Sequence, residues 1–267
     1  MYNRLIMRIL LLNVIFFLLI SFGFSQTTDF PEMIFVEGGS FKMGSTTGYD
    51  DEKPVHSVTL TNYYIGKYEV TVAQYRKYCT ATGKTFPAVP DAIWYEENEN
   101  ATEWEWKDKN PIVNVTYSEA VAYCEWLSKQ TGEEYTLPTE AQWEYAARGG
   151  KNSKGYNYSG SNNINEVAWY DETTYERGPR QVGLLKANEL GIYDMSGNAW
   201  EWCLDYYGAY SSSSQKNPTG ASSGTFRVIR GGSWYYTEDM ARNTVRDGPK
   251  PFYTNYNYGF RVAKIIK

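Results

Sequence analysis

The sequence of 267 residues contains a single histidine, His56, and only three cysteines, Cys79, Cys124 and Cys203. One histidine excludes any metal centre or catalytic mechanism that requires a cluster of histidines. Three cysteines permit at most one internal disulfide bond. Cys79 and Cys124 are the preferred pair because each lies late in a predicted helix, and three buried thiols are an equally supported alternative.

Basic residues are also fewer than acidic residues. The chain has 26 Lys and Arg against 31 Asp and Glu, which gives a formal net charge of −5 and an isoelectric point of about 5.2. A protein that binds nucleic acid through its phosphates needs the opposite balance. We therefore expect no nucleic acid among its partners.

Only one long hydrophobic run occurs, from Ile9 to Ile20, with Arg4 and Arg8 before it and small residues after it. This order is typical of a secretory signal peptide, so we predict a leader over residues 1–25 and export to the periplasm, the cell surface or the medium. The alternative, a membrane anchor, needs a longer apolar run. We expect no stable membrane span after cleavage, and residues 26–267 are long enough for a single domain.

Aromatic residues make up 17% of the chain, with 25 tyrosines and 9 tryptophans, and glycine-containing turns recur throughout. This mixture predicts a loop-rich domain with short strands. Met33–Val36 and Ser40–Met43 flank Gly38 and Gly39 and are predicted to form a hairpin. The stretch "HSVTLTNYYIGKYEVT" predicts further strands, and the polar "YGAYSSSSQKNPTGASSGT" predicts a surface loop.

Three helices are marked by capping boxes, in which a threonine accepts a hydrogen bond from a free amide and a residue three positions later reaches back. Glycines that tolerate a left-handed turn are expected to end the first two, and the third is expected to be short. The cap pairs are Thr71 with Gln74, Thr116 with Glu119, and Thr139 with Gln142, and the ends are Gly83, Gly132 and the residues before Gly149.

Six stretches occur in one order: "MIFVEGGSFKMGS", "NPIVNVTYSEAVAYCEWLSKQTG", "LPTEAQWEYAARGG", "NELGIYDMSGNAWEWC", "VIRGGSWYY" and "NYGFRVAK". Together they resemble the formylglycine-generating enzyme, or sulfatase-modifying factor, family over Phe30 to Lys264. The resemblance implies an α+β fold of the C-type-lectin type with about three helices, short strands and many loops.

Enzymes of that family oxidise a cysteine of a sulfatase to formylglycine with oxygen, using two cysteines that bind copper(I). The resemblance places the active-site serine at Ser233, the first of these cysteines at Tyr236 and the second within 238–241, where this chain has no thiol. Copper is therefore doubtful, because soft thiolate ligands are what copper(I) prefers. We predict a ligand-binding, protein-binding or structural module that has lost the oxidase site.

Two alternatives stay open for the function. The chain could be an active oxidoreductase of the formylglycine-generating type, or another tailoring enzyme built on the same fold. A related branch with a three-histidine iron site is excluded because His56 is the single histidine. Since a fold does not determine a function, whether the chain is an enzyme is left open at this point.

The "GNAWEW" region carries an expected calcium site. The resemblance implies ligands at Asp194, Gly197, Ala199 and Glu201, and carboxylate and carbonyl oxygens brought together by a tight turn suit this hard cation. The alternative is that Asp194 caps a turn and Glu201 forms an ion pair. Trp143, Trp200 and Trp202 are predicted to lie in the core, and Arg230 and Arg261 are expected to pair with acids.

The C-terminal segment is rich in tyrosine and asparagine, a combination that is common in recognition surfaces. An unknown protein, peptide or glycan is the expected partner. The alternative is that these tyrosines only cover the core. The candidate ligand-binding residues are Tyr235, Tyr236, Tyr253, Asn255, Tyr256 and Asn257.

Overall fold

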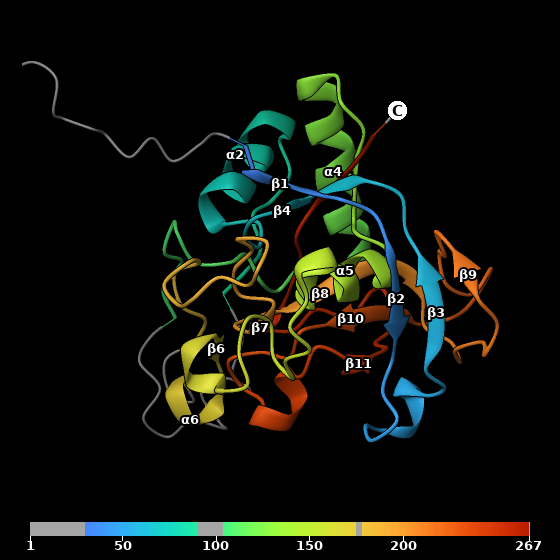
Figure 1. Cartoon of the computed structure of the whole chain (residues 1–267). Coiled ribbons are helices and arrows are strands. Elements are labelled where there is room, and N and C mark those ends of the chain that lie inside the picture. The colour runs from blue at the N-terminus through green and yellow to red at the C-terminus, as the bar shows by residue number, and fades with distance from the viewer. Residues whose placement is uncertain (1–29, 90–103, 175–177, 267) are drawn as a thin grey trace, which may run out of the picture.

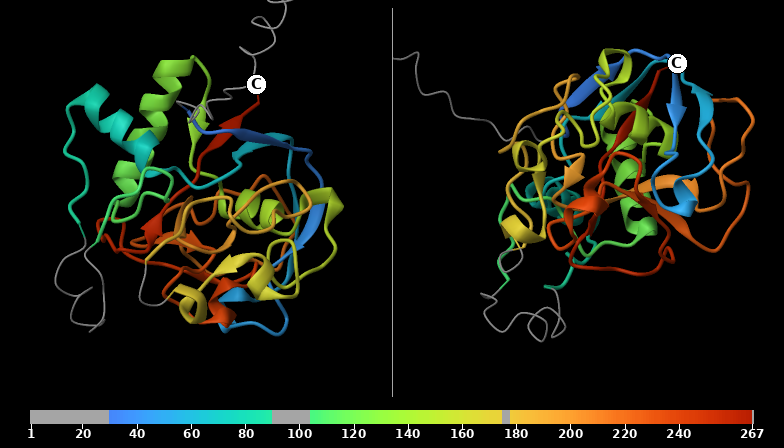
Figure 2. Two further views of the ribbon diagram at one scale, coloured as in Figure 1. Left: turned by 90° about the vertical axis from the view of Figure 1, so that its left-hand side faces the viewer. Right: turned by 60° about the horizontal axis from the view of Figure 1, so that its bottom comes forward.

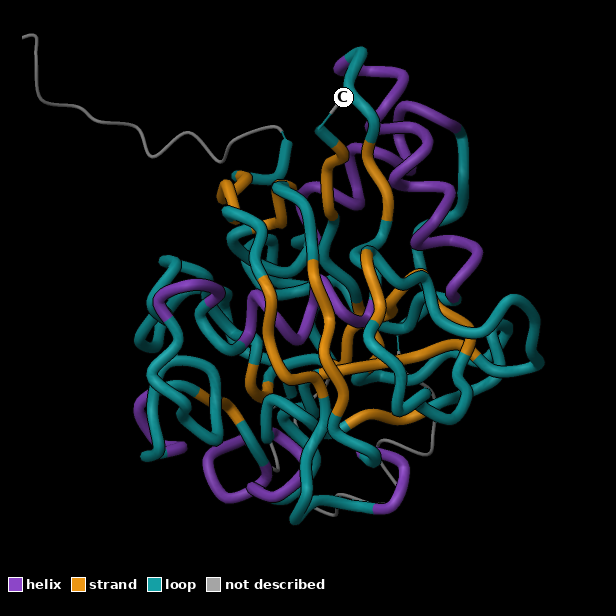
Figure 3. Tube along the Cα trace, turned by 45° about the vertical axis from the view of Figure 1, so that its right-hand side comes forward, coloured by secondary structure: helices purple, strands orange, loops and turns teal. Residues whose placement is uncertain are grey.

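The structure is a computed structural model that describes residues 30–89, 104–174 and 178–266. The predicted leader, residues 1–25, lies outside these ranges. Loops dominate the described residues, as Figure 3 shows. The α-helices among them are α2 (Val72–Thr82), α4 (Tyr117–Thr131), α5 (Glu140–Ala147) and α6 (Asp171–Thr174), and the short 3-10 helices are η1 (Asp50–Glu52), η2 (Gly150–Asn152), η3 (Ile164–Glu166) and η4 (Glu238–Ala241).

The strands are short, and most have two to four residues. They are β1 (Met33–Val36), β2 (Ser40–Met43), β3 (His56–Thr59), β4 (Tyr63–Gly66), β5 (Tyr135–Thr136), β6 (Ala168–Trp169), β7 (Ser196–Gly197), β8 (Trp200–Tyr206), β9 (Gln215–Lys216), β10 (Arg227–Arg230), β11 (Arg246–Asp247), β12 (Tyr258–Gly259) and β13 (Ala263–Ile265). They form sheets in the orders β1-β4-β13-β5, β11-β10-β8-β12, β2-β3-β9 and β6-β7.

The expected hairpin between β1 and β2 does not form, although both strands have the predicted bounds. β1 pairs with β4 and β2 pairs with β3, both antiparallel, so each strand belongs to a different sheet. The chain bends between them at Gly38, where an added Cβ would lie 2.3 Å from the carbonyl oxygen of Leu60. The glycines that suggested a two-residue turn instead allow this close crossing of two strand pairs.

The three predicted helices begin and end as the capping boxes indicate. The side chains of Thr71, Thr116 and Thr139 each accept a hydrogen bond from the amide three residues later. Gly83 and Gly132 end α2 and α4 in the left-handed conformation, with φ of 71° and 73°. The one-turn helix α6 was not predicted, and the polar loop after β8 contains the short strand β9.

The largest cluster of buried hydrophobic residues among those described joins α2 and α4 to β8 and β10 of the β11-β10-β8-β12 sheet. Helices α2 and α4 stand side by side at one end of the molecule (Figures 1 and 2), where Tyr75 stacks on Tyr123 with ring centroids 5.8 Å apart. Trp143, Trp200 and Trp202 are at most 1% exposed, which confirms their predicted place in the core. None of the described helices has the length and hydrophobicity that a membrane span requires.

All three cysteines are buried free thiols. Cys79 lies in α2 and Cys124 in α4, as expected, but the pair forms no disulfide bond, so the alternative of three buried thiols is the one that the structure has. Burial raises the pKa of each thiol, that of Cys203 well above its usual range. A buried thiol of raised pKa is a poor nucleophile and a poor metal ligand.

Candidate functional site

Two consecutive glycines shape the turn that follows β10. Gly231 and Gly232 have φ of 102° and 72°, and a Cβ on Gly232 would lie 2.7 Å from the carbonyl oxygen of Met240. Only glycine fits both the backbone conformation and the space at this position. The turn brings residues 233–236 from the end of β10 toward the loop that precedes β12.

Ser233 lies under this turn and is 1% exposed. Its Oγ accepts a long hydrogen bond of 3.4 Å from the amide of Tyr235, and its carbonyl accepts one of 3.1 Å from the amide of Tyr236. The backbone of the same turn is held by Trp234, whose amide donates to the carbonyl of Asn198 at 3.0 Å. The hydroxyl of Ser233 therefore helps to fix the turn.

Three of the candidate tyrosines come together on this turn. The ring of Tyr235 lies edge-on to Tyr236 at 5.9 Å and edge-on to Tyr256 at 5.4 Å between centroids. Trp200 supports Tyr236 from below at 5.9 Å, and Trp234 contacts Tyr256 at 5.7 Å. All three tyrosines are half-buried, so part of each residue is accessible to solvent while its ring packs against a neighbour.

Two asparagines belong to the same loop. The carbonyl of Asn257 accepts a hydrogen bond of 2.8 Å from the amide of Trp200, and the carbonyl of Asn255 accepts one of 3.0 Å from the amide of Asn114. The side chain of Asn257 is 1% exposed, yet neither its Oδ1 nor its Nδ2 has a hydrogen-bonding partner among the described residues. The Oδ1 of Asn255 is likewise buried and unpaired there. We call these two side chains, with Tyr235, Tyr236 and Tyr256, the aromatic-amide surface.

Tyr253 lies apart from these rings. It is 49% exposed and packs edge-on against Phe252 at 5.0 Å, in the turn before the asparagines. Lys250 lies 5.6 Å from the centre of its ring. The structure thus gathers five of the six candidate ligand-binding residues and gives Tyr253 different neighbours.

The carboxylate of Glu201, an expected calcium ligand, is occupied by protein groups. Arg261 donates to its two oxygens from Nε and Nη2 at 2.6 and 2.7 Å, and the indole Nε1 of Trp143 donates to Oε2 at 2.9 Å. Glu201 and Arg261 are both fully buried. These contacts match the alternative of an ion pair.

Asp194, the second expected acidic ligand, lies close to this ion pair. It is 4% exposed, has a φ of 58°, and accepts a hydrogen bond of 2.7 Å from the amide of Gly183. Burial raises its pKa to about 6. Within the ranges that the structure describes, no three His, Cys, Asp or Glu side chains are arranged to hold a metal ion. Calcium at the oxygens of Asp194, Gly197, Ala199 and Glu201 stays a prediction.

The sequence analysis does not predict one buried acid that lies near Asp194. Glu69 is 1% exposed, and neither carboxylate oxygen has a partner among the described residues. Burial, together with the charges of Asp194 and Glu201, raises its pKa well above the usual range. Three acids therefore face the single guanidinium of Arg261. Nothing in the stretch "KYEVT" distinguishes Glu69 from an exposed strand residue, because the charged residues near it come from distant segments.

A second ionic centre lies between α5 and the β11-β10-β8-β12 sheet. Arg230 donates to Glu144 from Nη2, and Arg246 donates to both oxygens of Glu140 at 2.7 and 2.9 Å. All four side chains are at most 5% exposed. The expectation that Arg230 and Arg261 pair with acids is confirmed.

The sequence and fold now allow comparison with known proteins. A family model described as the sulfatase-modifying factor enzyme 1-like domain matches residues 22–266. The chain belongs to the sulfatase-modifying factor family. Its α+β fold is the C-type-lectin-like fold of the formylglycine-generating enzyme type, as the resemblance implied.

Curated relatives of several kinds share the domain. The chain is 33% identical to the serine/threonine-protein kinase pkn1 of Chlamydia caviae, over 89% of this chain and 38% of that protein, so it spans about two fifths of the relative's length. It is 34% identical to the chaperone protein LppX of Paenibacillus barcinonensis over 81% and 83%. It is 30% identical to the formylglycine-generating enzyme of Streptomyces coelicolor over 85% and 87%.

Solved structures agree with the family. PvdO from Pseudomonas aeruginosa superposes with a TM-score of 0.76 at 29% identity, over 90% of this chain and 96% of that one. Treponema denticola variable protein 1 superposes with a TM-score of 0.72 at 26% identity, over 87% and 94%. The sulfatase-modifying factor fold is thus shared by proteins with very different names, and the site has to decide the function.

Proposed function

We propose that this protein is an exported member of the sulfatase-modifying factor family that binds a peptide segment of a partner protein and does not act as an oxidase. The observation that carries the proposal is the side chain of Asn257, a buried carboxamide without a partner among the described residues, set in a group of half-buried tyrosines. An unpaired buried amide costs free energy, and a ligand group that pairs with it would offset that cost.

The chemistry of the surface matches a peptide. A carboxamide offers both a donor and an acceptor, which is the complement of a backbone peptide unit. The tyrosine rings beside it provide rigid apolar area with little conformational entropy to lose. Because Asn257 is almost fully covered, a bound segment would have to displace the edge of a half-buried ring such as that of Tyr256. A glycan at this surface is the competing outcome.

The thiols support the loss of oxidase activity. Tyr236 stands where the family resemblance places the first copper-binding cysteine, and all three cysteines of the chain lie in the core. Their raised pKa values favour the neutral thiol, which binds copper(I) poorly. The relative LppX, named a chaperone protein, is consistent with a family member that binds protein.

An aldehyde assay tests the loss of oxidase activity. The protein without its leader is incubated with copper(I), oxygen and a peptide that contains the sulfatase cysteine motif. We expect no aldehyde product by mass spectrometry. Formation of formylglycine would overturn the proposal and restore the oxidoreductase alternative.

A peptide-display selection on the immobilised protein tests binding. We expect enriched peptides whose affinity falls about tenfold or more in Tyr236→Ala, because a packed aromatic anchor is lost. The control is Tyr64→Ala, another half-buried tyrosine that lies in β4 of a different sheet. Enriched peptides that bind both variants as well as the parent protein would contradict the proposed surface, and so would a selection that enriches none.

A further inference from the structure

A polar cavity of about 320 Å³ lies between the loop after β2 and the residues after η4. We call it the β2-η4 cavity. The end of α5 and the loop after η2 supply its other walls. The charged side chains that line it are all basic, namely Lys42, Arg148 and Arg242, and no Asp or Glu among the described residues lines it.

Arg148 has one nitrogen that is available to a ligand. Its Nε donates to Glu144 at 2.9 Å, and its Nη2 donates to the carbonyl of Gly44 at 2.9 Å. Its Nη1 has no hydrogen-bonding partner among the described residues, and it is not one of their buried unpaired atoms, so solvent reaches it. Because two contacts already fix the plane of the guanidinium group, Nη1 loses little conformational entropy when it binds an acceptor.

The carboxylate beside Arg148 does not neutralise this arginine alone. Glu144 is fully buried and also pairs with Arg230, which lies 3.8 Å from Glu140. Glu140 in turn pairs with Arg246 at 2.7 Å. This chain of ion pairs contains three arginines and two glutamates, so one formal positive charge is left over. Arg148 is the arginine of the three that lines the cavity, so an anion there is attracted by that charge.

Lys42 supplies a second cation that no acid neutralises. Its Nζ donates to the Oγ of Ser57 at 2.8 Å and forms no ion pair among the described residues. An ammonium group has three donors, so two remain for a ligand. Thr46 and Asn157, both exposed, add a hydroxyl group and a carboxamide to the lining. The cavity is therefore rich in donors that have no acceptor within the protein.

Arg242 is closer to neutral than the other two bases. It donates to both oxygens of Glu52 at 2.8 and 2.9 Å, and Glu52 is fully buried. This bidentate pair makes Arg242 a fixed polar wall of the cavity. The positive charge available to a ligand therefore comes mainly from Arg148 and Lys42.

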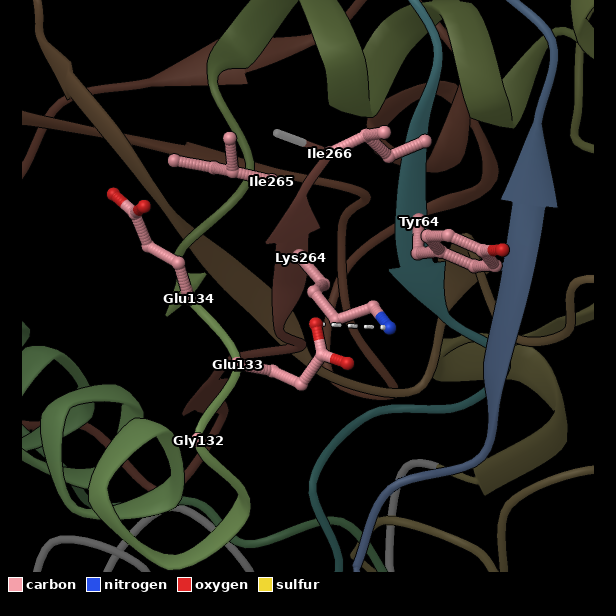
Figure 4. Close-up of a pocket in the computed structure, with 7 residues that line it drawn as sticks. All are labelled: Tyr64, Gly132, Glu133, Glu134, Lys264, Ile265 and Ile266. Atoms are coloured by element: carbon pink, nitrogen blue, oxygen red, sulfur yellow. Dashed lines mark ion pairs between the residues drawn. The ribbon is translucent and has the colours of Figure 1, made fainter.

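Two other cavities are lined by acids as well as bases. The cavity beside the C-terminus has about 280 Å³ and contains an ion pair of 3.5 Å between Lys264 and Glu133 (Figure 4). The cavity beside β9 has about 230 Å³ and is lined by Glu140 and Asp205. An anion would meet carboxylates in both. Of these three cavities in the described part of the chain, the β2-η4 cavity is the one whose charge suits an anion.

We propose that the β2-η4 cavity binds a tetrahedral oxyanion, phosphate or sulfate, either free or as part of an ester. Its donors lie on separate segments, with Lys42 and Thr46 at the end of β2, Arg148 at the end of α5 and Asn157 after η2. Donors on several sides suit a group whose oxygens point in several directions, and a planar carboxylate contacts fewer of them. The volume leaves room for the organic part of an ester. This site is separate from the aromatic-amide surface and goes beyond the proposed function.

A titration of the protein without its predicted leader tests the site. The probes are inorganic phosphate, inorganic sulfate, methyl phosphate and methyl sulfate, with acetate as the planar control, all at one fixed ionic strength. Calorimetry and amide NMR shifts follow the binding. We expect a tetrahedral anion to bind in the millimolar range or more tightly and to shift the amides of residues 44–47, 148 and 155–157. A methyl ester that binds more tightly than its inorganic ion identifies an ester as the ligand, and the opposite order identifies the free ion.

Three variants separate binding in the cavity from a general effect of charge. Lys42→Met removes an exposed cation and should weaken binding about fivefold, the effect of one lost hydrogen bond. Lys216→Met is the matched control, because Lys216 is exposed, lies in β9 of the same sheet as Lys42 and is outside the cavity, and it should leave the affinity unchanged. Arg148→Lys keeps the charge but loses Nη1, and it should weaken binding about tenfold.

Several outcomes would overturn the proposal. Failure of every tetrahedral anion to bind is one, and acetate binding as tightly as they do is another. Equal losses of affinity in Lys42→Met and Lys216→Met would show a general charge effect without a site. Amide shifts confined to residues outside the cavity would likewise exclude it. Lys42 is exposed and holds no ion pair among the described residues, so loss of folding does not explain the effect of its variant.

Discussion

Two asparagines from different regions of the molecule show a clear contrast. Asn188 opens the scaffold stretch Asn188–Cys203, and its carboxamide is fully used: Nδ2 donates to Ala146 and Ser159, and Oδ1 accepts from two amides at 3.0 and 3.2 Å. Asn257, on the aromatic-amide surface, is at least as well buried and has no side-chain partner among the described residues.

The difference extends beyond these two side chains. In the scaffold stretch, Arg261 and Trp143 donate hydrogen bonds to Glu201, so the carboxylate of this motif is paired within the protein. On the aromatic-amide surface, the carboxamide of Asn257 and the Oδ1 of Asn255 have no partner among the described residues. In the scaffold stretch, a high density of charged and aromatic residues therefore marks the centre of the scaffold, whereas the unpaired carboxamide atoms of Asn255 and Asn257 are the polar groups on which the proposed surface rests.

The largest expected effect on stability comes from removing the buried ion pair between Arg261 and Glu201 in the scaffold stretch. Arg261→Met leaves Glu201 buried with one donor, Trp143, and an uncompensated charge. We expect the free energy of unfolding to fall by about 3–5 kcal/mol, the usual cost of removing one partner of a buried ion pair. Urea denaturation followed by tryptophan fluorescence measures the change.

The double variant Arg261→Met with Glu201→Gln is the control for this prediction. It removes the unpaired charge and should recover at least half of the lost stability. A single variant that loses less than about 1 kcal/mol would show that the ion pair does not hold the scaffold.

A pH effect of smaller size is expected at Asp205, two residues beyond the scaffold stretch. Burial, and then the charge of Glu140, raises the pKa of Asp205 to about 7. A raised pKa in the folded state means that the stability from this group is fully present below its ordinary pKa near 4 and is lost as the pH rises through about 7. We expect Asp205→Asn to be more stable than the parent at pH 8, by about 2–4 kcal/mol, and to lose that advantage at pH 4.

The asparagine variant preserves the local geometry of Asp205. Its Oδ1 can still accept the hydrogen bond of 2.8 Å that the amide of Glu140 donates to the carboxylate. Unfolding curves of both proteins between pH 4 and pH 8 measure the difference, which removes the shared contribution of other acids. If the difference in free energy of unfolding between the two proteins does not change with pH, the raised pKa of the buried Asp205 carboxyl is contradicted.

A matched pair of substitutions tests the two asparagines directly. Asn188→Leu should cost about 2–3 kcal/mol, because it leaves amides and carbonyls of the scaffold unpaired. Asn257→Leu, of the same shape, should leave the free energy of unfolding within about 0.5 kcal/mol or raise it, since it removes an unpaired group. Thermal and urea unfolding measure both, and equal losses would remove the contrast on which the proposed surface rests.

Short sequence patterns predicted the local structure of this chain well. The capping pairs at Thr71, Thr116 and Thr139 fix helix starts through contacts within four residues, so their positions could be read directly. The glycine pair at Gly38 was misread as a hairpin because the choice of partner for β1 and β2 depends on β4 and β3, which lie later in the chain.

The site was harder to predict, because it too depends on segments that are distant in the sequence. The motifs identified the family and predicted that Tyr235, Tyr236 and Tyr256 belong to one surface. No sequence pattern shows whether a carboxamide forms hydrogen bonds after folding. Glu69 was missed because its neighbours Asp194 and Arg261 are more than a hundred residues away. Unpaired atoms are properties of the whole packing, so they become visible only in three dimensions.

The smallest expected effect concerns calcium, and it tests whether the scaffold needs a metal. Because Arg261 and Trp143 already donate to the carboxylate of Glu201, we expect calcium to add little stability, and a chelator to lower the melting temperature by only about 2–4 °C, the shift that roughly 1 kcal/mol of binding to the native state gives in a domain of this size. An unchanged melting temperature would contradict the calcium prediction. Differential scanning fluorimetry with and without EDTA measures this. A clear fall that added calcium reverses, and that Asp194→Asn abolishes, would mean that calcium binds at Asp194, Gly197, Ala199 and Glu201 without displacing the ion pair, and that the scaffold stretch is satisfied only when the metal is present.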